Sequence, residues 1–199
     1  MEKQKPKLYI MIGLPGSGKS TWARNQKLEV ISSDLIRKEI YDDEDAQDNP
    51  AEVFAIAKDR AQKYLTLGKD VIFDATNISR KRRAEMFRRF SKMADLVAVY
   101  MAKHYETCIL QNENRERKVP VFVIDRMYKQ LEIPDWAEGW SDIMIIGEET
   151  QQIFVPFHNK LFTEQEIYDN IYFSDIYDRD QRNPKYHVYT VSKHSWLVY

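Results

Sequence analysis

The segment GLPGSGKSTWAR, residues 13–24, constrains the fold of this chain more than any other stretch. It holds three of the chain's 6 glycines within six positions, and a Lys-Ser pair follows the third glycine directly. The apolar run KLYIMI precedes it, and STWARNQ, which lacks glycine and proline, follows it. Between a strand and a helix, the pattern G-x-x-x-x-G-K-[ST] is a phosphate-binding loop. The plain alternative is a glycine turn that precedes a Lys-Ser pair by chance.

Two side chains of this loop have the chemistry of a magnesium nucleotide site. Lys19 would reach the β- and γ-phosphates, and the Ser20 hydroxyl would ligate the Mg²⁺ that bridges them. The other expected ATP contacts come from the loop and the start of the helix: Gly13, Leu14, Pro15, Gly16, Ser17, Gly18 and Thr21. The loop therefore predicts binding of ATP or GTP, but it does not identify the acceptor.

Composition excludes several broad classes of protein. The chain has 199 residues, of which 43% are hydrophobic, so it suits one compact domain with room for an appendage. Its net charge of -1 argues against a globally basic nucleic-acid binder, so a polynucleotide would be held by a local patch. The single Cys108 permits no internal disulfide, and no stretch approaches the ~20 apolar residues of a membrane span. We expect a cytoplasmic protein with no membrane partner.

Apolar runs predict strands at residues 8–12, 28–32, 70–74, 96–101 and 142–146. Helix-like segments separate most of them, and one has its own boundaries, with Asn49 as cap, Pro50 at the first helical position and Gly68 at the end. This alternation predicts an α/β fold with a parallel sheet covered by helices on both faces. The nucleotide and the acceptor would then meet at the carboxyl ends of the strands.

Phosphoryl transfer to an alcohol needs a carboxylate near the hydroxyl and cations near the phosphates. Asp34 follows the second predicted strand and Arg37 lies three positions on, so both would face one site from the first helical turn, as a base and an anion clamp. The alternative is that Asp34 only caps its helix. The third predicted strand ends in FDATN, where Asp74, Thr76 and Asn77 would bind Arg37, metal-bound water or substrate.

Two basic segments lie near this edge of the predicted sheet. SRKRRAEMFRRFSK, residues 79–92, would either contact an anionic substrate in part or form a solvated helix face. QNENRERKVP, residues 111–120, contains Arg115 and Arg117 and is typical of an arginine-bearing lid that closes over phosphates, or of a basic helix end. Because the two arginines are two positions apart, they cannot share one helix face, and we expect different roles for them.

Together these motifs resemble a known family. In their order and spacing, GLPGSGKSTWAR, ISSDLIR, FDATNISRKRR and NRERKVPVFVIDRMYKQLE resemble the kinase domain of the bacteriophage-type polynucleotide 5′-hydroxyl kinase, over roughly residues 7–132. The resemblance implies a P-loop kinase that phosphorylates 5′-hydroxyl ends of RNA or DNA, as in nucleic-acid repair. With the five predicted strands and the change of pattern after residue 148, we expect this kinase domain to span residues 1–148. On the acceptor side it implies Asp34 as general base, Arg37 on the phosphate next to the acceptor nucleotide, and Asp74 as a substrate-side carboxylate.

On the nucleotide side the resemblance implies Lys19 and Ser20 as the residues for ATP and Mg²⁺, and Arg115 as the lid arginine on the β/γ-phosphates. The chain departs from the family at Gln111, where a further lid arginine is expected, and its lid is one residue shorter. Arg115 and Arg117 could therefore exchange roles.

Residues 149–199 lie outside the repeating pattern and predict a C-terminal extension. NPKYHVYTVSKHSWLVY, with His187 and His194, resembles the opening helix of an HD-type metal-dependent phosphohydrolase domain, in which a histidine and then a His-Asp pair bind metal. The sequence stops before any His-Asp pair, so we expect no phosphatase activity. The alternatives are a longer natural protein, or a segment that packs on the kinase domain or docks to a partner.

Two other functions are alternatives. A small-molecule P-loop kinase, acting on a nucleoside, a sugar nucleotide or adenylylsulfate, would use the same loop, although the basic residues at 80–83 and 88–89 favour a polymeric anion. A nucleotide-dependent binding or switch module needs no acceptor-side base, so the set Asp34, Arg37 and Arg115 argues against it. RNA and DNA are not distinguished, because that choice depends on 2′-hydroxyl contacts that the sequence does not reveal.

Overall fold

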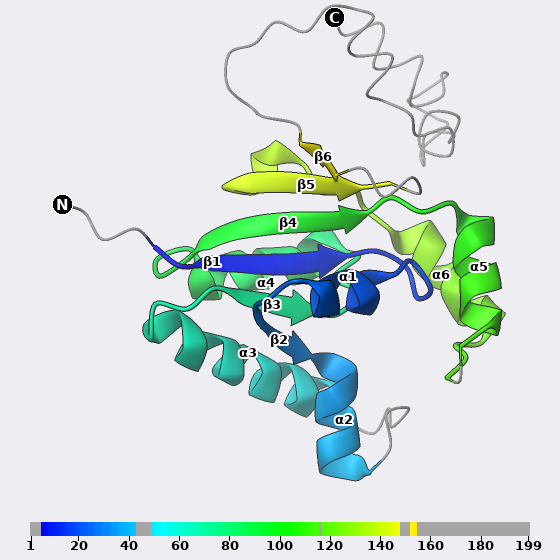
Figure 1. Ribbon diagram of the computed structural model, residues 1–199, viewed down its shortest axis with the longest axis horizontal. Helices are drawn as coiled ribbons and strands as arrows, with labels where there is room; N and C mark the ends of the chain where they lie inside the picture. The colour runs from blue at the N-terminus through cyan, green and yellow to red at the C-terminus, as the bar shows by residue number, and fades with distance from the viewer. Residues whose placement is uncertain (1–4, 43–48, 116, 148–151, 155–199) are drawn as a thin grey trace, which may run out of the picture. The chain divides into compact units, whose positions relative to one another are not determined.

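The computed structural model describes residues 5–42, 49–115, 117–147 and 152–154. A six-stranded sheet in the order β2-β3-β1-β4-β5-β6 forms its centre, and β1 to β5 run parallel (Figure 1). The strands are β1 (Lys7–Ile12), β2 (Glu29–Ser32), β3 (Val71–Asp74), β4 (Asp95–Met101), β5 (Asp142–Ile146) and β6 (Gln152–Phe154). The predicted five-stranded parallel sheet is confirmed, with every strand within one residue of its expected bounds.

Strand β6 lies beyond the boundary that the sequence predicts at residue 148. It runs antiparallel to β5, with Ile153 opposite Ile145. A run of 3 residues gives no periodic signal, which is why the sequence assigned it to the extension. All described residues belong to the first of two units into which the chain divides, Met1–Pro156. The HD-like segment with His187 and His194 lies outside the described residues.

Helices connect the strands, and one of them has the boundaries that the sequence predicts. Asn49 accepts a hydrogen bond from the N–H of Glu52, Pro50 opens the helix, and Gly68 follows its end with a φ of 75°. The helices are α1 (Lys19–Asn25), α2 (Ser33–Tyr41), α3 (Pro50–Thr66), α4 (Arg80–Phe90), α5 (Tyr105–Glu113), α6 (Val121–Gln130) and the 3-10 helix η1 (Trp136–Glu138). Within the described ranges, none of them has both the length and the apolar character of a membrane span.

Side chains of the strands alternate between two helical layers. Met11 of β1 points to one face, where it packs in the core with Ala23 of α1. Phe73 of β3 points to the other face, where its ring stacks on Phe54 of α3 with the centroids 6.4 Å apart. Arg82 of α4 lies over the same Phe54 ring, 5.2 Å from its centroid. The predicted covering of both faces is therefore present, with α1 on one face and α3 and α4 on the other.

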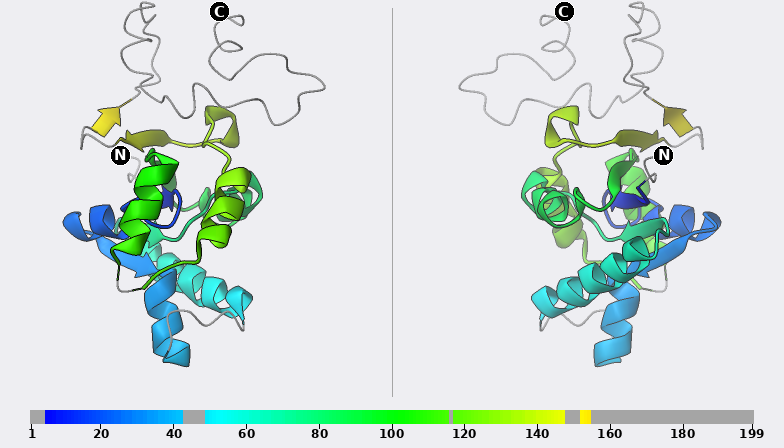
Figure 2. Two further views of the ribbon diagram at one scale, coloured as in Figure 1. Left: turned by 90° about the vertical axis from the view of Figure 1, so that its right-hand side faces the viewer. Right: turned by 90° about the vertical axis from the view of Figure 1, so that its left-hand side faces the viewer.

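Helices α5 and α6 lie together at the carboxyl ends of β1 and β4, toward the viewer in the left panel of Figure 2. Tyr105 of α5 meets Tyr128 of α6 with ring centroids 4.9 Å apart, and its hydroxyl donates a hydrogen bond to Asp125. That bond raises the pKa of Tyr105 to about 12. The helix pair thus borders the sheet edge at which α/β folds bind their ligands.

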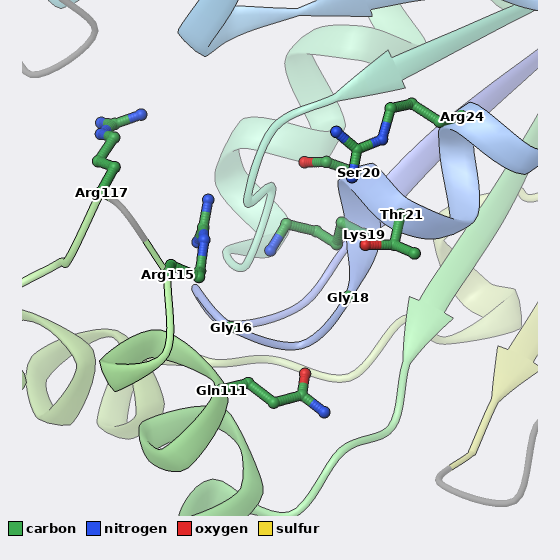
Figure 3. A pocket seen from close by; sticks show the side chains of 9 residues that line it. All are labelled: Gly16, Gly18, Lys19, Ser20, Thr21, Arg24, Gln111, Arg115 and Arg117. Atoms are coloured by element: carbon green, nitrogen blue, oxygen red, sulfur yellow. The ribbon is translucent and has the colours of Figure 1, made fainter.

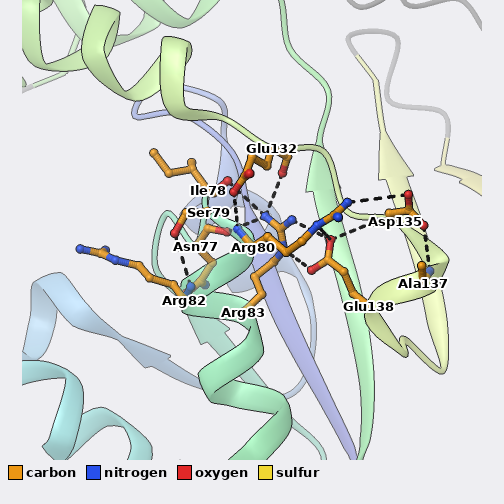
Figure 4. A network of polar contacts seen from close by, with 10 residues as sticks. All are labelled: Asn77, Ile78, Ser79, Arg80, Arg82, Arg83, Glu132, Asp135, Ala137 and Glu138. Carbon is orange, nitrogen blue, oxygen red and sulfur yellow. Dashed lines mark hydrogen bonds and ion pairs between the residues drawn. The ribbon is translucent and has the colours of Figure 1, made fainter. Parts of the chain in front are cut away.

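Arg83 of α4 is a buried charge that joins several segments at this edge (Figure 4). Its Nε and Nη2 each donate to one oxygen of Glu138 at 2.7 Å. Its Nη1 donates to the backbone carbonyls of Asn77, Ile78 and Glu132. All three guanidinium nitrogens therefore have partners. We call Arg83, Glu138 and these three carbonyls the Arg83 hub.

The hub corrects part of the expectation for the basic segment 79–92. Arg83 is 0% exposed, so it contacts neither a substrate nor solvent. Arg89 has a partner within the chain, since it bonds at the surface to Asp59 of α3. Lys81 and Arg88 are exposed. For these two residues, both predicted alternatives, contact with an anionic substrate or a solvated helix face, therefore stay open. A run of basic residues thus contains both buried and solvent-exposed cations, because only some positions of a helix face the core.

Candidate active site

The glycine loop between β1 and α1 adopts the wrapped conformation that its motif predicts. Gly13, Gly16 and Gly18 have φ angles of 152°, 81° and 88°, a region that residues with a Cβ rarely adopt. At Gly16 there is also no space, because a Cβ there would lie 2.2 Å from the carbonyl oxygen of Cys108 in α5. Helix α5 therefore presses directly against the loop.

Lys19 folds its side chain back onto this loop. Its Nζ donates to the carbonyl oxygens of Gly13 at 3.0 Å and Leu14 at 2.6 Å. Burial lowers the pKa of Lys19, and the negative charge of Asp74 partly offsets that effect. Phosphate oxygens would be stronger acceptors than these carbonyls, since they are charged. The ammonium group thus fits the predicted phosphate-binding role.

Asp74 ends β3 and is 5% exposed. Burial raises the pKa of Asp74, whereas Lys19 and a hydrogen bond from the Ser20 side chain act to lower it. A hydroxyl beside a carboxylate provides the oxygen ligands that Mg²⁺ prefers when it also binds nucleotide phosphates. In the part of the chain that the structure describes, no cluster of three or more His, Cys, Asp or Glu side chains could hold a metal by itself. Ser20 and Asp74 therefore fit a Mg²⁺ whose other ligands are phosphate and water.

A pocket of about 480 Å³ opens beside the loop (Figure 3). The loop, α1, α5 and the segment after α5 form its lining, with Gly16, Gly18, Lys19, Ser20, Thr21, Arg24, Gln111, Arg115 and Arg117. The predicted nucleotide residues thus meet the predicted lid. Arg24 is a lining residue that the sequence reasoning missed, although its position four residues after Ser20 on one helix could have revealed it.

Asp34 does not cap α2. Ser32 has that position, because its hydroxyl accepts a hydrogen bond from the N–H of Leu35. The capping alternative for Asp34 is therefore wrong. Instead, Oδ1 of Asp34 accepts a hydrogen bond from Nη1 of Arg37 at 2.6 Å, and the carboxylate is 41% exposed. The two side chains lie together in the first half of the helix, as their spacing predicts.

Arg37 has one hydrogen-bond donor without a partner among the described residues. Its side chain is 12% exposed, and among the described residues its buried Nε has no hydrogen-bond partner. A buried, unpaired donor on a charged group is unfavourable by about 1–3 kcal/mol or more. This donor is therefore a candidate contact for an anionic ligand next to Asp34.

The two arginines of the predicted lid act on different parts of the site. The charge of Arg115 adds to the effect of burial in lowering the pKa of Lys19. Arg117 donates instead from Nη1 to Oδ2 of Asp34 at 2.9 Å. Asn112 anchors the segment that carries both, because its buried amide exchanges two hydrogen bonds with the backbone of Val119, at 2.8 and 2.9 Å. Sequence reasoning missed Asn112, since nothing in QNENRER distinguishes a buried amide from an exposed one.

Asn77 is held inside the fold instead of facing a substrate. It is 2% exposed, and its Nδ2 donates to the carbonyls of Met11 at 2.8 Å and Ala75 at 3.3 Å. Its φ of 41° lies in the left-handed region, which asparagine adopts more readily than most residues. We therefore correct its predicted role: Asn77 joins the loop after β3 to the end of β1.

Comparison with protein families relates this site to known proteins. A family model described as an AAA domain matches residues 8–134. The chain belongs to this AAA-domain family. The matched range contains the glycine loop, the Asp34–Arg37 pair, Arg115 and Arg117. The candidate site of this family member therefore lies wholly within the shared domain.

Two relatives match over most of the chain. The chain is 26% identical over 163 residues to the L-seryl-tRNA(Sec) kinase of Methanococcus maripaludis, covering 73% of this chain and 60% of that protein. It is 25% identical over 174 residues to the transcription factor bHLH140 of Arabidopsis thaliana, covering 80% of this chain and 18% of that protein. The chain thus spans less than two thirds of the length of either relative.

Solved structures share the fold. A chain of the Pnkp1/Rnl/Hen1 RNA repair complex has a TM-score of 0.58 at 24% identity, covering 65% of this chain and 45% of that one. The APS kinase CysC of Mycobacterium tuberculosis has a TM-score of 0.52 at 17% identity, covering 84% of this chain and 98% of that one. At these identities the likeness shows the fold alone, which is the P-loop kinase α/β fold.

Proposed function

We propose that this chain is an ATP-dependent kinase that transfers the γ-phosphoryl group to a 5′-hydroxyl end of RNA or DNA. The proposal rests mainly on the position of the Asp34–Arg37 pair, which lies at the same edge of the sheet as the glycine loop. The carboxylate is 41% exposed, so it is accessible to a hydroxyl. The buried Nε of Arg37 lacks a partner within the described residues and fits an acceptor phosphate beside that hydroxyl.

On the nucleotide side, ATP and Mg²⁺ fit the residues of the loop. Lys19 would exchange its hydrogen bonds to the Gly13 and Leu14 carbonyls for bonds to β- and γ-phosphate oxygens. Ser20 and Asp74 would face the Mg²⁺, and the bound nucleotide supplies the phosphoryl group. Arg115 would stabilise the negative charge that spreads over the phosphoryl oxygens during transfer.

On the acceptor side, Asp34 would orient the hydroxyl and accept its proton. A carboxylate has about four lone-pair sites. The bonds from Arg37 and Arg117 use one site on each oxygen, so each oxygen retains a further site. Arg37 would bind the adjacent phosphate and thereby fix the position of the hydroxyl, which lowers the entropic part of the barrier.

The names of two similar proteins support an acceptor on RNA. The relative at 26% identity is named an L-seryl-tRNA(Sec) kinase, and the structure at a TM-score of 0.58 is that of an RNA repair complex. A hydroxyl of an amino acid carried by tRNA is therefore the second candidate acceptor, favoured by the first of these two likenesses.

Labelled ATP distinguishes the candidates in one assay. The acceptors are 5′-dephosphorylated RNA and DNA oligonucleotides, seryl-tRNA, a nucleoside, adenylylsulfate and water alone. We expect label on the oligonucleotide ends, and no transfer by Lys19→Ala, because this cation stabilises charge on the phosphate oxygens. Label only on seryl-tRNA would favour the second candidate. Label only on the nucleoside or adenylylsulfate would overturn the proposal, as would nucleotide binding without transfer to any acceptor.

A further inference from the structure

Asp34 is bound by arginines from two separate segments of the chain. Arg37 of α2 donates to Oδ1 at 2.6 Å, and Arg117 of the segment after α5 donates to Oδ2 at 2.9 Å. The Arg37 contact is local, three residues along one helix. The Arg117 contact joins residues 83 positions apart in sequence, 34 and 117, so it ties the lid to the helix that carries the proposed base.

We propose that Arg117 is a positioning residue for Asp34, and that it makes the lid part of the acceptor side of the site. This inference rests on the proposed function, since it assigns Asp34 as the base. Arg117 acts through the carboxylate that it binds, and it is not the lid residue that binds the nucleotide phosphates.

The arrangement of the two lid arginines supports this division. Both line the pocket, but in Figure 3 Arg115 lies alongside the glycine loop and Lys19, whereas Arg117 lies farther from the loop. The charge of Arg115 acts on Lys19 and Asp74, the residues expected around the phosphates and Mg²⁺. Arg117 is 20% exposed on its side chain and pairs with Asp34.

The physical reason for a second arginine is the freedom of the Asp34 side chain. With 41% of its side chain exposed, packing alone does not fix the carboxylate plane. Charge-assisted hydrogen bonds to both oxygens, from two different segments, restrict both rotatable bonds. A base that is already held in its productive orientation loses less entropy when the transition state forms. We therefore expect the loss of this restraint to lower kcat.

Steady-state kinetics of four variants test the assignment. Arg117→Ala should lower kcat roughly 10- to 100-fold, as expected for a charge-assisted hydrogen bond, with the KM for ATP within about twofold of wild type. Arg117→Lys should restore part of kcat. Arg115→Ala should lower kcat and also raise the KM for ATP, because Arg115 lies beside the phosphates. Lys118→Ala, which removes an exposed neighbouring cation, should change neither kcat nor the KM for ATP.

A double-mutant cycle separates positioning from a general structural effect. In an Asp34→Asn background, Arg117→Ala should cause less than about a threefold further loss of kcat, because the group that it positions is already gone. Full additivity of the two losses would overturn the proposal. So would an equal rise in the KM for ATP in Arg115→Ala and Arg117→Ala.

A readout without any acceptor keeps this inference distinct from the proposed function. Asp34→Ala should speed tryptic cleavage after Lys118 at fixed ATP, because Arg117 loses its hydrogen-bond acceptor on α2, while Ser32→Ala should not. Unchanged cleavage in Asp34→Ala would overturn the inference even if the kinase assay succeeds. Failure of every nucleic-acid acceptor would overturn the proposed function, and faster cleavage would then still support the link between Arg117 and Asp34.

Discussion

Arg83 and Arg37 both bind a carboxylate through their guanidinium groups, but their surroundings differ. Arg83 is 0% exposed, and each of its three nitrogens has a partner in the hub formed with Glu138 and three backbone carbonyls. Arg37 binds a carboxylate that is 41% exposed, and its buried Nε lacks a partner within the described residues. The first cluster is complete without a ligand, and the second is not.

This difference shows how to separate structural from functional charges in one fold. A buried pair with all of its hydrogen bonds satisfied stabilises the arrangement of segments and has no capacity left for a substrate. A cluster with an accessible oxygen and an unpaired donor retains that capacity, at a cost in stability. The hub therefore holds the loop after β3 and the segment after α6 in place, whereas the Asp34 cluster retains hydrogen-bonding capacity for a ligand.

The largest expected effect comes from breaking the hub. Arg83→Met leaves Glu138 charged and 5% exposed with its main partner removed, so we expect a loss of about 3–5 kcal/mol in the free energy of unfolding. Urea denaturation measures this loss. Arg89→Met on the same helix should lose less than about 1 kcal/mol, because its partner Asp59 is 63% exposed. Equal losses in the two variants would contradict the structural role of the hub.

Adding Glu138→Gln to Arg83→Met sharpens this test. The second substitution removes the uncompensated buried charge, so the double variant should recover part of the lost free energy of unfolding. A double variant less stable than Arg83→Met alone would show that Glu138 contributes through other contacts, such as its bond to the N–H of Asp135.

Changing the proposed base, Asp34, should affect activity and leave the fold intact. Asp34→Asn should lower kcat by about 10²–10⁴, the range for the loss of a general base. Its free energy of unfolding should change by less than about 1 kcal/mol, because the carboxylate is 41% exposed and Ser32 caps the helix. Parallel activity and denaturation measurements check both values. A lower free energy of unfolding with an unchanged kcat would show that Asp34, like Arg83, has a structural role.

Arg37→Ala tests whether the unpaired donor binds an acceptor phosphate. Wild type should prefer a nucleoside 3′-phosphate over the bare nucleoside, because the phosphate anchors the acceptor beside Asp34. The variant should lower kcat on both acceptors, because Asp34 loses its bond to Arg37, and should in addition lose most of that preference, about 10- to 100-fold in the ratio of the two kcat/KM values. Competition between the two acceptors measures the ratio. Equal use of both acceptors by wild type would mean that Arg37 does not bind such a phosphate.

The smallest expected effect concerns the exposed cations of α4. Lys81→Ala with Arg88→Ala should weaken binding of a 5′-hydroxyl oligonucleotide and leave a nucleoside 3′-phosphate unaffected. If both cations contact phosphates of a single strand, the slope of log affinity against log salt should fall by about 0.7 per residue. Lys27→Ala, an exposed cation before β2, is the matched control. An unchanged slope would identify α4 as a solvated face.

Local sequence patterns predicted most of the fold, because strands and helix caps depend on residues that are neighbours in the chain. The five parallel strands follow from apolar runs, and the cap at Asn49 follows from the geometry of a helix start. Strand β6 was missed because it is short and is defined by its pairing with β5. The cap at Ser32 was missed because two adjacent serines precede Asp34, and only the backbone shows which residue is the cap.

By itself, the sequence determined the phosphate-binding loop, the parallel sheet and the position of Asp34 and Arg37 on one side of a helix. Each of these depends on residues close together in the chain, where bond geometry restricts the possible conformations. Only the tertiary structure decided that Arg83 is buried, that Asn77 serves the fold and that Arg117 binds Asp34. Burial and long-range hydrogen bonds depend on which segments pack together, and a one-dimensional pattern does not specify the partner of a charged side chain.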